Sequence, residues 1–215
     1  WFGMCDQANM ARLLRRKHYS IVDLIPSSGR LTKYSAHWLR TVIIILMNKK
    51  AFAALVLIML VAAFFRLWDL KNIPPGLWAD EAMNGTNALV ALEQKDWKVF
   101  YPENFGREGF FINIQSLFAA VLGNEPWVLR LPSAIFGILT VFGLYLMTKE
   151  LFGIRVALTA SFFLATLFWH INFSRIGFRA IMAPFFLVWA FYFLFLAMRK
   201  SKEWLFAVAG LVFGL

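Results

Sequence analysis

The sequence predicts an all-α polytopic transmembrane protein with about five spans and an external juxtamembrane helix. The chain of 215 residues is 60% hydrophobic and only 16% charged, and its mean hydropathy is +0.64. This is the composition of a membrane protein rather than of a soluble core. The apolar residues gather in runs of membrane length, and the basic residues gather before and between these runs. The net charge of +10 therefore indicates membrane orientation rather than nucleic-acid binding.

The first apolar run is long enough to cross a membrane, since its residues reach about 27 Å at about 1.5 Å each. The predicted spans are residues 51–68, 131–147, 156–173 and 180–198, and a fifth that begins at residue 204. Arg66, near the end of the first span, is expected to snorkel to the interface. The apolar run 110–122 is short for a span and contains polar residues, which favours a helix lying in the interface.

The basic residues predict the orientation of these spans. Nine precede the first span, and two further clusters lie at 149–155 and 199–202. If the run 110–122 does not cross, all three clusters fall on one side, as the positive-inside rule requires. The N-terminus is then cytoplasmic, and the loop 69–130 lies outside a cell (plasma or inner) membrane.

Two adjacent carboxylates, Asp80 and Glu81, follow the first span and are the strongest candidates for chemistry. Charged groups beside hydrocarbon are costly and call for a functional reason. We interpret Asp80 as a base for an incoming hydroxyl. The alternative is that both are solvated loop charges or first-turn acids of a following helix, where negative charge suits the helix dipole.

The segment 80–85, Asp-Glu-Ala-Met-Asn-Gly, resembles the Asp-Glu motif in the first external loop of the protein O-mannosyltransferases and their bacterial relatives. These polytopic GT-C glycosyltransferases (glycosyltransferase family 39-like) include the lipid A aminoarabinose transferase. The likeness continues in order, over about residues 50–200, through segments 106–111, 130–137, 145–153 and 174–175. In two places the sequence departs from the family. Arg107-Glu108 stands where the family has His-Pro-Pro, and no acid follows Ser174-Arg175, so the sugar and the acceptor are left open.

The resemblance implies a GT-C-like fold and transfer of a sugar from a polyprenyl-phosphate donor to a hydroxyl acceptor on a protein, lipid or glycan, with inversion. Because the leaving group is already an anionic phosphate, the reaction needs a base and cations rather than a general acid. Asp80 would be the base. Glu81 would orient the acceptor or Asp80, or help to hold a divalent ion.

Three arginines are candidates for the donor phosphate, since the planar guanidinium suits a pair of phosphate oxygens. Arg175 and Arg179 are four apart and share a face if a helix continues through them. Arg107 would reach the phosphate from the loop. The alternative is that Arg175 and Arg179 snorkel to lipid headgroups.

The supporting candidates are Arg130, Glu108 and His170. Arg130 precedes Pro132 and is interpreted as an anchor or as an ion-pair partner of Asp80 or Glu125. His170 is an interface histidine or a ligand to metal or phosphate. No cofactor is predicted beyond a divalent metal ion, for which Asp80, Glu81 or His170 are the candidates. The helix 110–122 would form a wall of the lipid-donor groove, or it would only pack against the neighbouring helices.

The domain organisation is predicted from the same pattern. Residues 1–46 are expected to be a basic cytoplasmic extension, and residues 47–215 the N-terminal part of a transmembrane catalytic domain that is truncated at its C-terminus. The single cysteine, Cys5, excludes an internal disulfide and a cysteine metal cluster. Lys49-Lys50 and the apolar run that comes next also resemble a signal peptide, but the continuation through Arg66-Leu67-Trp68 favours an anchor.

Two other classes of function stay open. A transporter or flippase of lipid-linked sugars also concentrates charge in a membrane cavity, but usually near the midplane and with repeated halves. Here the ionisable residues lie at one interface, and no repeat is visible. A non-catalytic membrane subunit would keep the fold without activity, and substitution of Asp80 discriminates it from an enzyme.

Overall fold

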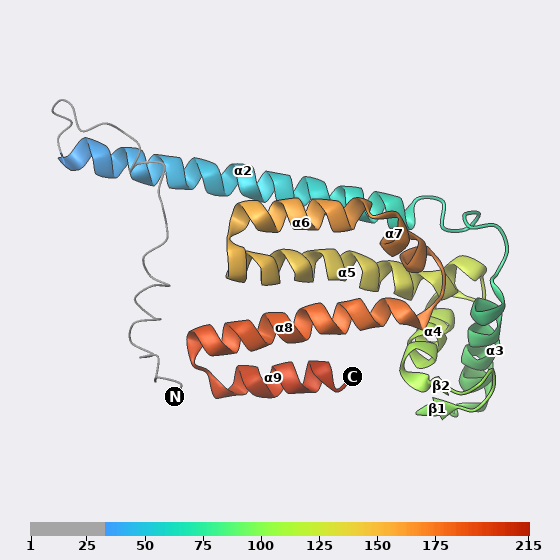
Figure 1. Cartoon of the computed structure of the whole chain (residues 1–215). Helices are drawn as coiled ribbons and strands as arrows, with labels where there is room; N and C mark the ends of the chain where they lie inside the picture. Colours follow the sequence, from blue (N-terminus) through green and yellow to red (C-terminus); the bar gives the residue numbers. More distant parts are fainter. Residues whose placement is uncertain (1–32) are drawn as a thin grey trace, which may run out of the picture. The chain divides into compact units, whose positions relative to one another are not determined.

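The computed structural model describes the backbone of residues 33–215 and the side chains of residues 49–215. Residues 1–32, which hold Cys5 and most of the expected basic extension, lie outside the described residues. The chain divides into two units, Trp1–Leu46 and Met47–Leu215, and the second unit carries all the described side chains. Apart from one short hairpin, the second unit is built of helices (Figure 1), which confirms the all-α prediction.

Three helical segments are long and apolar enough to cross a membrane. They are Lys49–Leu67 within α2 (Lys33–Leu67), α5 (Pro126–Phe152), and Arg179–Lys200, which joins the 3-10 turn η2 (Arg179–Ile181) to α8 (Met182–Lys200). A fourth span is formed if α6 (Ile154–Thr166) and α7 (Phe168–Arg175), which meet at 57°, are taken together. The prediction of a polytopic membrane protein is confirmed, with three or four spans in the described part of the chain.

The fifth expected span corresponds to α9 (Glu203–Phe213), an apolar helix of 11 residues. At about 1.5 Å per residue it covers roughly 16 Å, about half of the hydrocarbon core. Hydropathy correctly predicted an apolar helix from residue 204 onwards, of which the structure describes these 11 residues.

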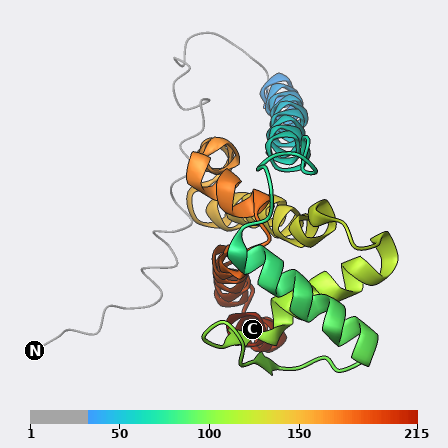
Figure 2. The ribbon, with the colours of Figure 1, turned by 90° about the vertical axis from the view of Figure 1, so that its right-hand side faces the viewer.

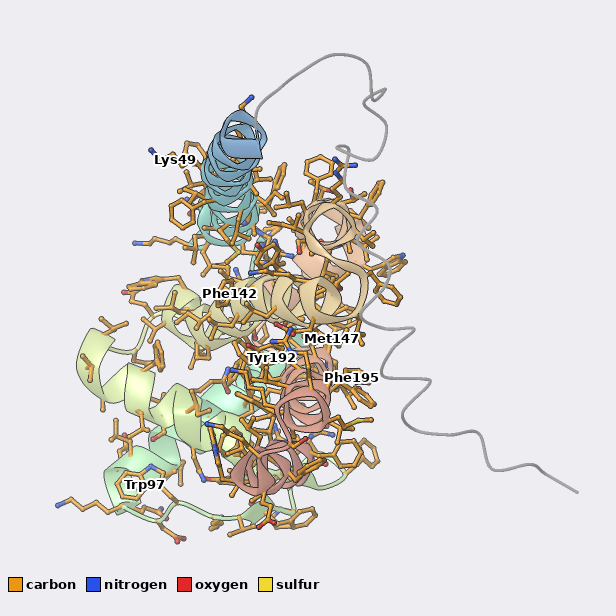
Figure 3. All side chains as sticks on the ribbon, turned by 90° about the vertical axis from the view of Figure 1, so that its left-hand side faces the viewer. Lys49, Trp97, Phe142, Met147, Tyr192 and Phe195 are labelled. Atoms are coloured by element: carbon orange, nitrogen blue, oxygen red, sulfur yellow. The ribbon has the colours of Figure 1, made fainter. Side chains whose placement is uncertain are left out.

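The helices of the second unit run back and forth between two ends (Figure 1). Helices α5, α6, α8 and α9 lie side by side with the 47–67 part of α2, while α3 (Ala79–Gln94) and α4 (Gly109–Leu122) lie across one end. We call this the loop end, and Figure 2 views the molecule from it. The opposite end, the basic end, holds the segments 49–50, 149–155 and 199–202 (Figure 3). Because α2 finishes and α5 begins at the loop end, the segment 110–122 is a helix that does not cross.

Helix α5 is the centre of the bundle, since it contacts α4, α6, α7 and α8. Small residues allow the close approaches that membrane helices use. A β-carbon added at Gly137 would lie 2.2 Å from Ser174 Oγ on α7, and one at Gly143 would lie 2.9 Å from the Trp189 ring on α8. Helix α2 joins α5 and α6 through a cluster of buried apolar side chains, namely Ile58, Ala62, Val141 and Ala165.

Arg66 does not snorkel as the sequence suggested, because its side chain is fully buried. It donates to the Leu164 and Ala165 carbonyls, at 3.2 and 3.0 Å, beside the break between α6 and α7. Carbonyls at a helix end lack intrahelical donors, and unpaired backbone groups are expensive in hydrocarbon. Arg66 therefore supplies the donors that let the third predicted span bend inside the bundle.

The loop end has a small core of its own. Strands β1 (Phe100–Tyr101) and β2 (Arg107–Glu108) pair in antiparallel fashion and stand between α3 and α4 in sequence. Ala88, Ala91, Tyr101 and Ile112 pack together and join α3, β1 and α4. Gly109 begins α4 against the chain before β1, where a β-carbon would lie 1.9 Å from the Lys98 carbonyl oxygen, so only glycine fits.

Candidate functional site

A polar pocket of about 440 Å³ lies at the loop end, bounded by three separate parts of the chain. One wall is the start of α3, another is the hairpin between β1 and β2, and the third is the connection from α7 into α8. The lining residues are Asp80, Asn84, Asn104, Phe105, Gly106, Arg107, Phe178 and Arg179. The pocket thus brings together Asp80 and two of the three arginines that the sequence proposed for an anionic ligand.

One face of α3 organises this pocket. Asp80, Asn84 and Asn87 are spaced by four and three residues, so they lie on the same side of the helix. Each of them bonds the hairpin segment 103–107. The bonds run from Asn104 Nδ2 to Asp80 Oδ1 (2.8 Å), from Arg107 Nη1 to Asn84 Oδ1, and from Asn87 Nδ2 to Glu103 Oε2 (3.4 Å). The hairpin is therefore fixed to α3 at three points.

Asp80 and Glu81 both lie in the first turn of α3, as the alternative interpretation of these acids allowed. Their side chains nevertheless go to different places. Asp80 is partly exposed and lines the pocket, with Oδ1 accepting from Asn104. Its second oxygen, Oδ2, receives no hydrogen bond from the residues that the structure describes.

Glu81 is away from the pocket and only 1% exposed. Its Oε1 accepts from Arg130 Nε at 3.0 Å and from the Gly177 backbone nitrogen at 2.6 Å. Its Oε2 accepts from the Trp78 backbone nitrogen at 2.9 Å and from Arg130 Nη2 at 3.3 Å. With both oxygens engaged, Glu81 joins three chain segments, and the geometry does not place it to orient an acceptor or hold an ion.

Arg130 is indeed an ion-pair partner, but of Glu81 and not of Asp80 or Glu125. It also donates to the carbonyls of Leu70 (3.3 Å), Pro74 (2.8 Å) and Gly76. These residues belong to the segment 69–78 that connects α2 to α3, which we call the strap. Arg130 thus ties the strap and the start of α3 to α5.

Arg175 holds the other side of the strap. Its guanidinium donates to the carbonyls of Phe65, Trp68 and Ile73, at 2.8, 2.7 and 2.8 Å. It does not line the polar pocket. Its donors serve backbone carbonyls at the end of α2 and in the strap.

Arg107 is better placed for an anion than the sequence suggested. Its side chain is 3% exposed, with Nη1 bonded to Asn84 and Nε 3.4 Å from the Glu103 carbonyl oxygen. Its Nη2 is buried and has no hydrogen-bond partner among the described residues. Burial and the nearby Arg179 lower the pKa of Arg107, while Asp80 and Glu103 act in the opposite direction. An anion bound in the pocket would lie beside this guanidinium and favour its charged form.

Arg179 stands where two cavities meet. It lines the polar pocket and also an apolar groove of about 470 Å³ between α4, α8 and α9. The groove is lined by Glu108, Phe110, Arg179, Ala180, Met182, Ala183, Phe186, Leu187, Phe213 and Leu215. Glu108, a predicted supporting residue, pairs with Arg179 at 3.2 Å (Nε to Oε2) at this junction. Phe110 of α4 contributes to the wall of this groove.

His170 is buried in α7 and is not part of the pocket. Its Nδ1 lies 2.8 Å from Arg66 Nη2, so the ring belongs to the network around the break between α6 and α7. Among the residues that the structure describes, no three His, Cys, Asp or Glu side chains come together as a metal site would require. Asp80, Glu81 and His170 therefore do not form a joint metal centre.

The sequence interpretation missed Asn84 and Asn104 as pocket residues. A signal for Asn84 exists, since Asp80, Asn84 and Asn87 form a polar face at helical spacing. Asn104 has no such signal, because only the folded hairpin brings it to Asp80.

Comparison with known proteins agrees with this architecture. The model of the family described as dolichyl-phosphate-mannose-protein mannosyltransferase matches residues 110–215. Two proteins of Bacillus subtilis (strain 168) are also similar. "Putative mannosyltransferase YkcB" is 31% identical over 164 residues, which are 71% of this chain and 22% of that protein. "Putative mannosyltransferase YycA" is 30% identical over 182 residues, which are 78% of this chain and 25% of that protein.

The chain is a relative of the GT-C membrane glycosyltransferases. It spans about a quarter of the length of the curated relatives that it matches, or slightly less. No solved structure matches it. The family match includes every residue that lines the apolar groove except Glu108, because it begins at Phe110 and continues through α8 and α9.

Proposed function

We propose that this chain carries the base and the donor-binding groups of a membrane glycosyltransferase that moves a sugar from a polyprenyl-phosphate donor to a hydroxyl acceptor. The observation that carries the proposal is the position of Arg179. Arg179 lines both the polar pocket with Asp80 and the apolar groove. A lipid-linked sugar phosphate needs such a site. The cation would bind the phosphate, the apolar groove on one side would hold the lipid, and the base on the other side would serve the acceptor.

The contacts support a single displacement. The acceptor oxygen attacks the anomeric carbon of the sugar while the bond from that carbon to the phosphate oxygen breaks. The hydroxyl proton passes to Asp80, whose free Oδ2 would lie within about 3 Å of it in a productive pose. Polyprenyl phosphate leaves with the bonding electron pair. Attack from the face opposite the phosphate inverts the anomeric carbon.

The charge that develops on the phosphate would be met by Arg107 and Arg179. Arg107 offers a buried nitrogen that lacks a partner among the described residues, and Arg179 offers a side chain that now pairs with Glu108. Fixed donors aimed at developing charge are an effective source of rate enhancement. The apolar groove would hold the first isoprene units of the donor.

The basic residues favour one orientation of the protein in the membrane. The basic end carries Lys and Arg at all three of its described segments, which favours the cytoplasmic side. The pocket then faces the external side of a cell (plasma or inner) membrane, where a protein, lipid or glycan hydroxyl would be the acceptor.

The test is sugar transfer by membranes that hold the complete protein, supplied with a panel of labelled polyprenyl-phosphate sugars. Asp80→Asn is compared with wild type and with Asp96→Asn, which makes the same change at an exposed loop residue outside the pocket. We expect Asp80→Asn to lose about 10²–10⁴-fold in turnover at equal abundance, and Asp96→Asn to lose none. Equal turnover in all three, or none with any donor, would overturn the proposal in favour of a transporter or a non-catalytic subunit.

A further inference from the structure

Asn104 is a pocket residue to which the proposed reaction gives no role, although it bonds the proposed base. It lies in the hairpin turn between β1 and β2 with φ of 53°, in the left-handed region that asparagine tolerates better than most residues. Its side-chain amide donates to Asp80 Oδ1 at 2.8 Å. The contact joins residues 24 apart in sequence, so it depends on the folded hairpin.

The hairpin holds this amide firmly. Asn87 bonds Glu103 on one side of Asn104, and Asn84 bonds Arg107 on the other. A turn bond from the Gly106 nitrogen to the Glu103 carbonyl, at 3.3 Å, closes the loop between them. The amide of Asn104 is thus presented to Asp80 from a tethered backbone.

A hydrogen bond to one oxygen of a carboxylate restricts the rotation of that group. The bond to Oδ1 leaves Oδ2 as the oxygen available to a hydroxyl. Catalytic geometry is sensitive to small displacements, so a fixed carboxylate is worth more than a free one.

We propose that Asn104 is a positioning residue that orients the Asp80 carboxylate and aims Oδ2 at the acceptor hydroxyl. The inference rests on the proposed function, because it assigns a partner to the base of that reaction. Asn104 itself touches neither the sugar carbon nor the phosphate in this role.

The charges around Asp80 come from several elements. Arg107 of β2 and Arg179 of η2 line the same pocket as Asp80. Glu103 is the acid of the same hairpin and is bonded by Asn87, and Glu81 on α3 is paired with Arg130. A new carboxylate at position 104 would be nearer to Asp80 than any of these acids.

Two variants separate positioning from folding. Asn104→Gly keeps the left-handed backbone and removes the amide, while Asn104→Asp keeps the size and replaces the donor by a negative charge. We expect both to lower kcat by about tenfold or more, the value of one hydrogen bond to a charged group, with the donor KM nearly unchanged. Asn104→Asp should also move the fall of activity on the acid side to higher pH, because a like charge disfavours the charged base.

The matched control is Asn72→Gly. Asn72 makes the same kind of bond, Nδ2 to Asp69 Oδ1 at 2.7 Å, on the exposed strap away from the pocket. This variant should keep the wild-type kcat and pH profile. All rates are normalised to the amount of folded protein.

The results test the positioning role of Asn104 separately from the proposed transferase function. If Asp80→Asn is inactive while both Asn104 variants keep the wild-type kcat and pH profile, the positioning role is overturned and the transferase stands. If activity falls only in proportion to folded protein, Asn104 is structural and the inference fails. If the wild type transfers no sugar from any donor, the proposed function itself fails.

Discussion

At the scale of residues, two arginines that look alike in the sequence have opposite surroundings. Arg175 directs its donors to carbonyls at the end of α2, whereas Arg107 keeps one buried nitrogen without a partner among the described residues. Arg107→Gln should lower kcat/KM for the donor about 10–100-fold, because a bond to charged phosphate is lost. Arg175→Gln should instead lower the free energy of unfolding by about 1–3 kcal/mol, since it leaves partly buried carbonyls unpaired.

The measurements are donor kinetics and thermal unfolding of the two purified variants. A donor KM that rises in Arg175→Gln at normal stability, with Arg107→Gln unaffected, would contradict the assignment and restore Arg175 as the phosphate ligand.

Residue roles were only partly predictable from the sequence, and the reason is physical. The spacing of Arg175 and Arg179 shows that two cations are near one interface, but not which carbonyls lack donors. Arg175 and Arg130 bind the strap, whose carbonyls have no helical or sheet partners. Asp80 lines the pocket while its neighbour Glu81 pairs with Arg130, a difference that the two adjacent letters of the sequence do not show.

At the scale of elements, the close contact of α5 with α7 depends on a glycine. A β-carbon at Gly137 would stand 2.2 Å from Ser174 Oγ. Gly137→Val should therefore destabilise the fold by about 1–3 kcal/mol through overpacking. Gly210→Val on α9 is the control, because nothing lies within 4 Å of its β-carbon position. Thermal unfolding in detergent compares the two, and an equal loss in both would show that the interface does not depend on glycine.

The apolar groove gives a second prediction at this scale. Ala183 of α8 lines the groove, so Ala183→Trp should fill part of it. The KM for a long-chain donor should rise about tenfold, equivalent to some two buried methylene groups, while a short-chain donor should be used as before. Ala183→Ser serves as the control. The same rise for both chain lengths would show that the groove does not hold the lipid.

The spans could be predicted from the sequence because the thickness of hydrocarbon sets their length. The bend between α6 and α7 could not. Helix kinks usually occur at proline or glycine, whereas here the break falls at Leu167, and its stability comes from Arg66 on a different helix.

At the scale of the whole molecule, the orientation in the membrane can be tested directly. In a Cys5→Ser background, which removes the single cysteine of the chain, Asp96→Cys marks the loop end and Lys202→Cys the basic end. A membrane-impermeant maleimide should label position 96 in intact cells and position 202 only after permeabilisation, because basic clusters favour the cytoplasmic side. Labelling of position 202 alone in intact cells would place the pocket in the cytoplasm.

The strap carries a consequence for how the protein is made. Synthesis proceeds from the N-terminus, so α2, the strap and Asp80 leave the ribosome before Arg130 of α5 and Arg175 of α7. Both arginines bind the strap. Glu81 can form its hydrogen bonds only after Arg130 and Gly177 have been synthesised. A nascent chain that ends before α7 therefore carries the strap without Arg175 and Glu81 without its bond from the Gly177 nitrogen. The pocket matures late, when the third predicted span has been inserted and has turned back on the first.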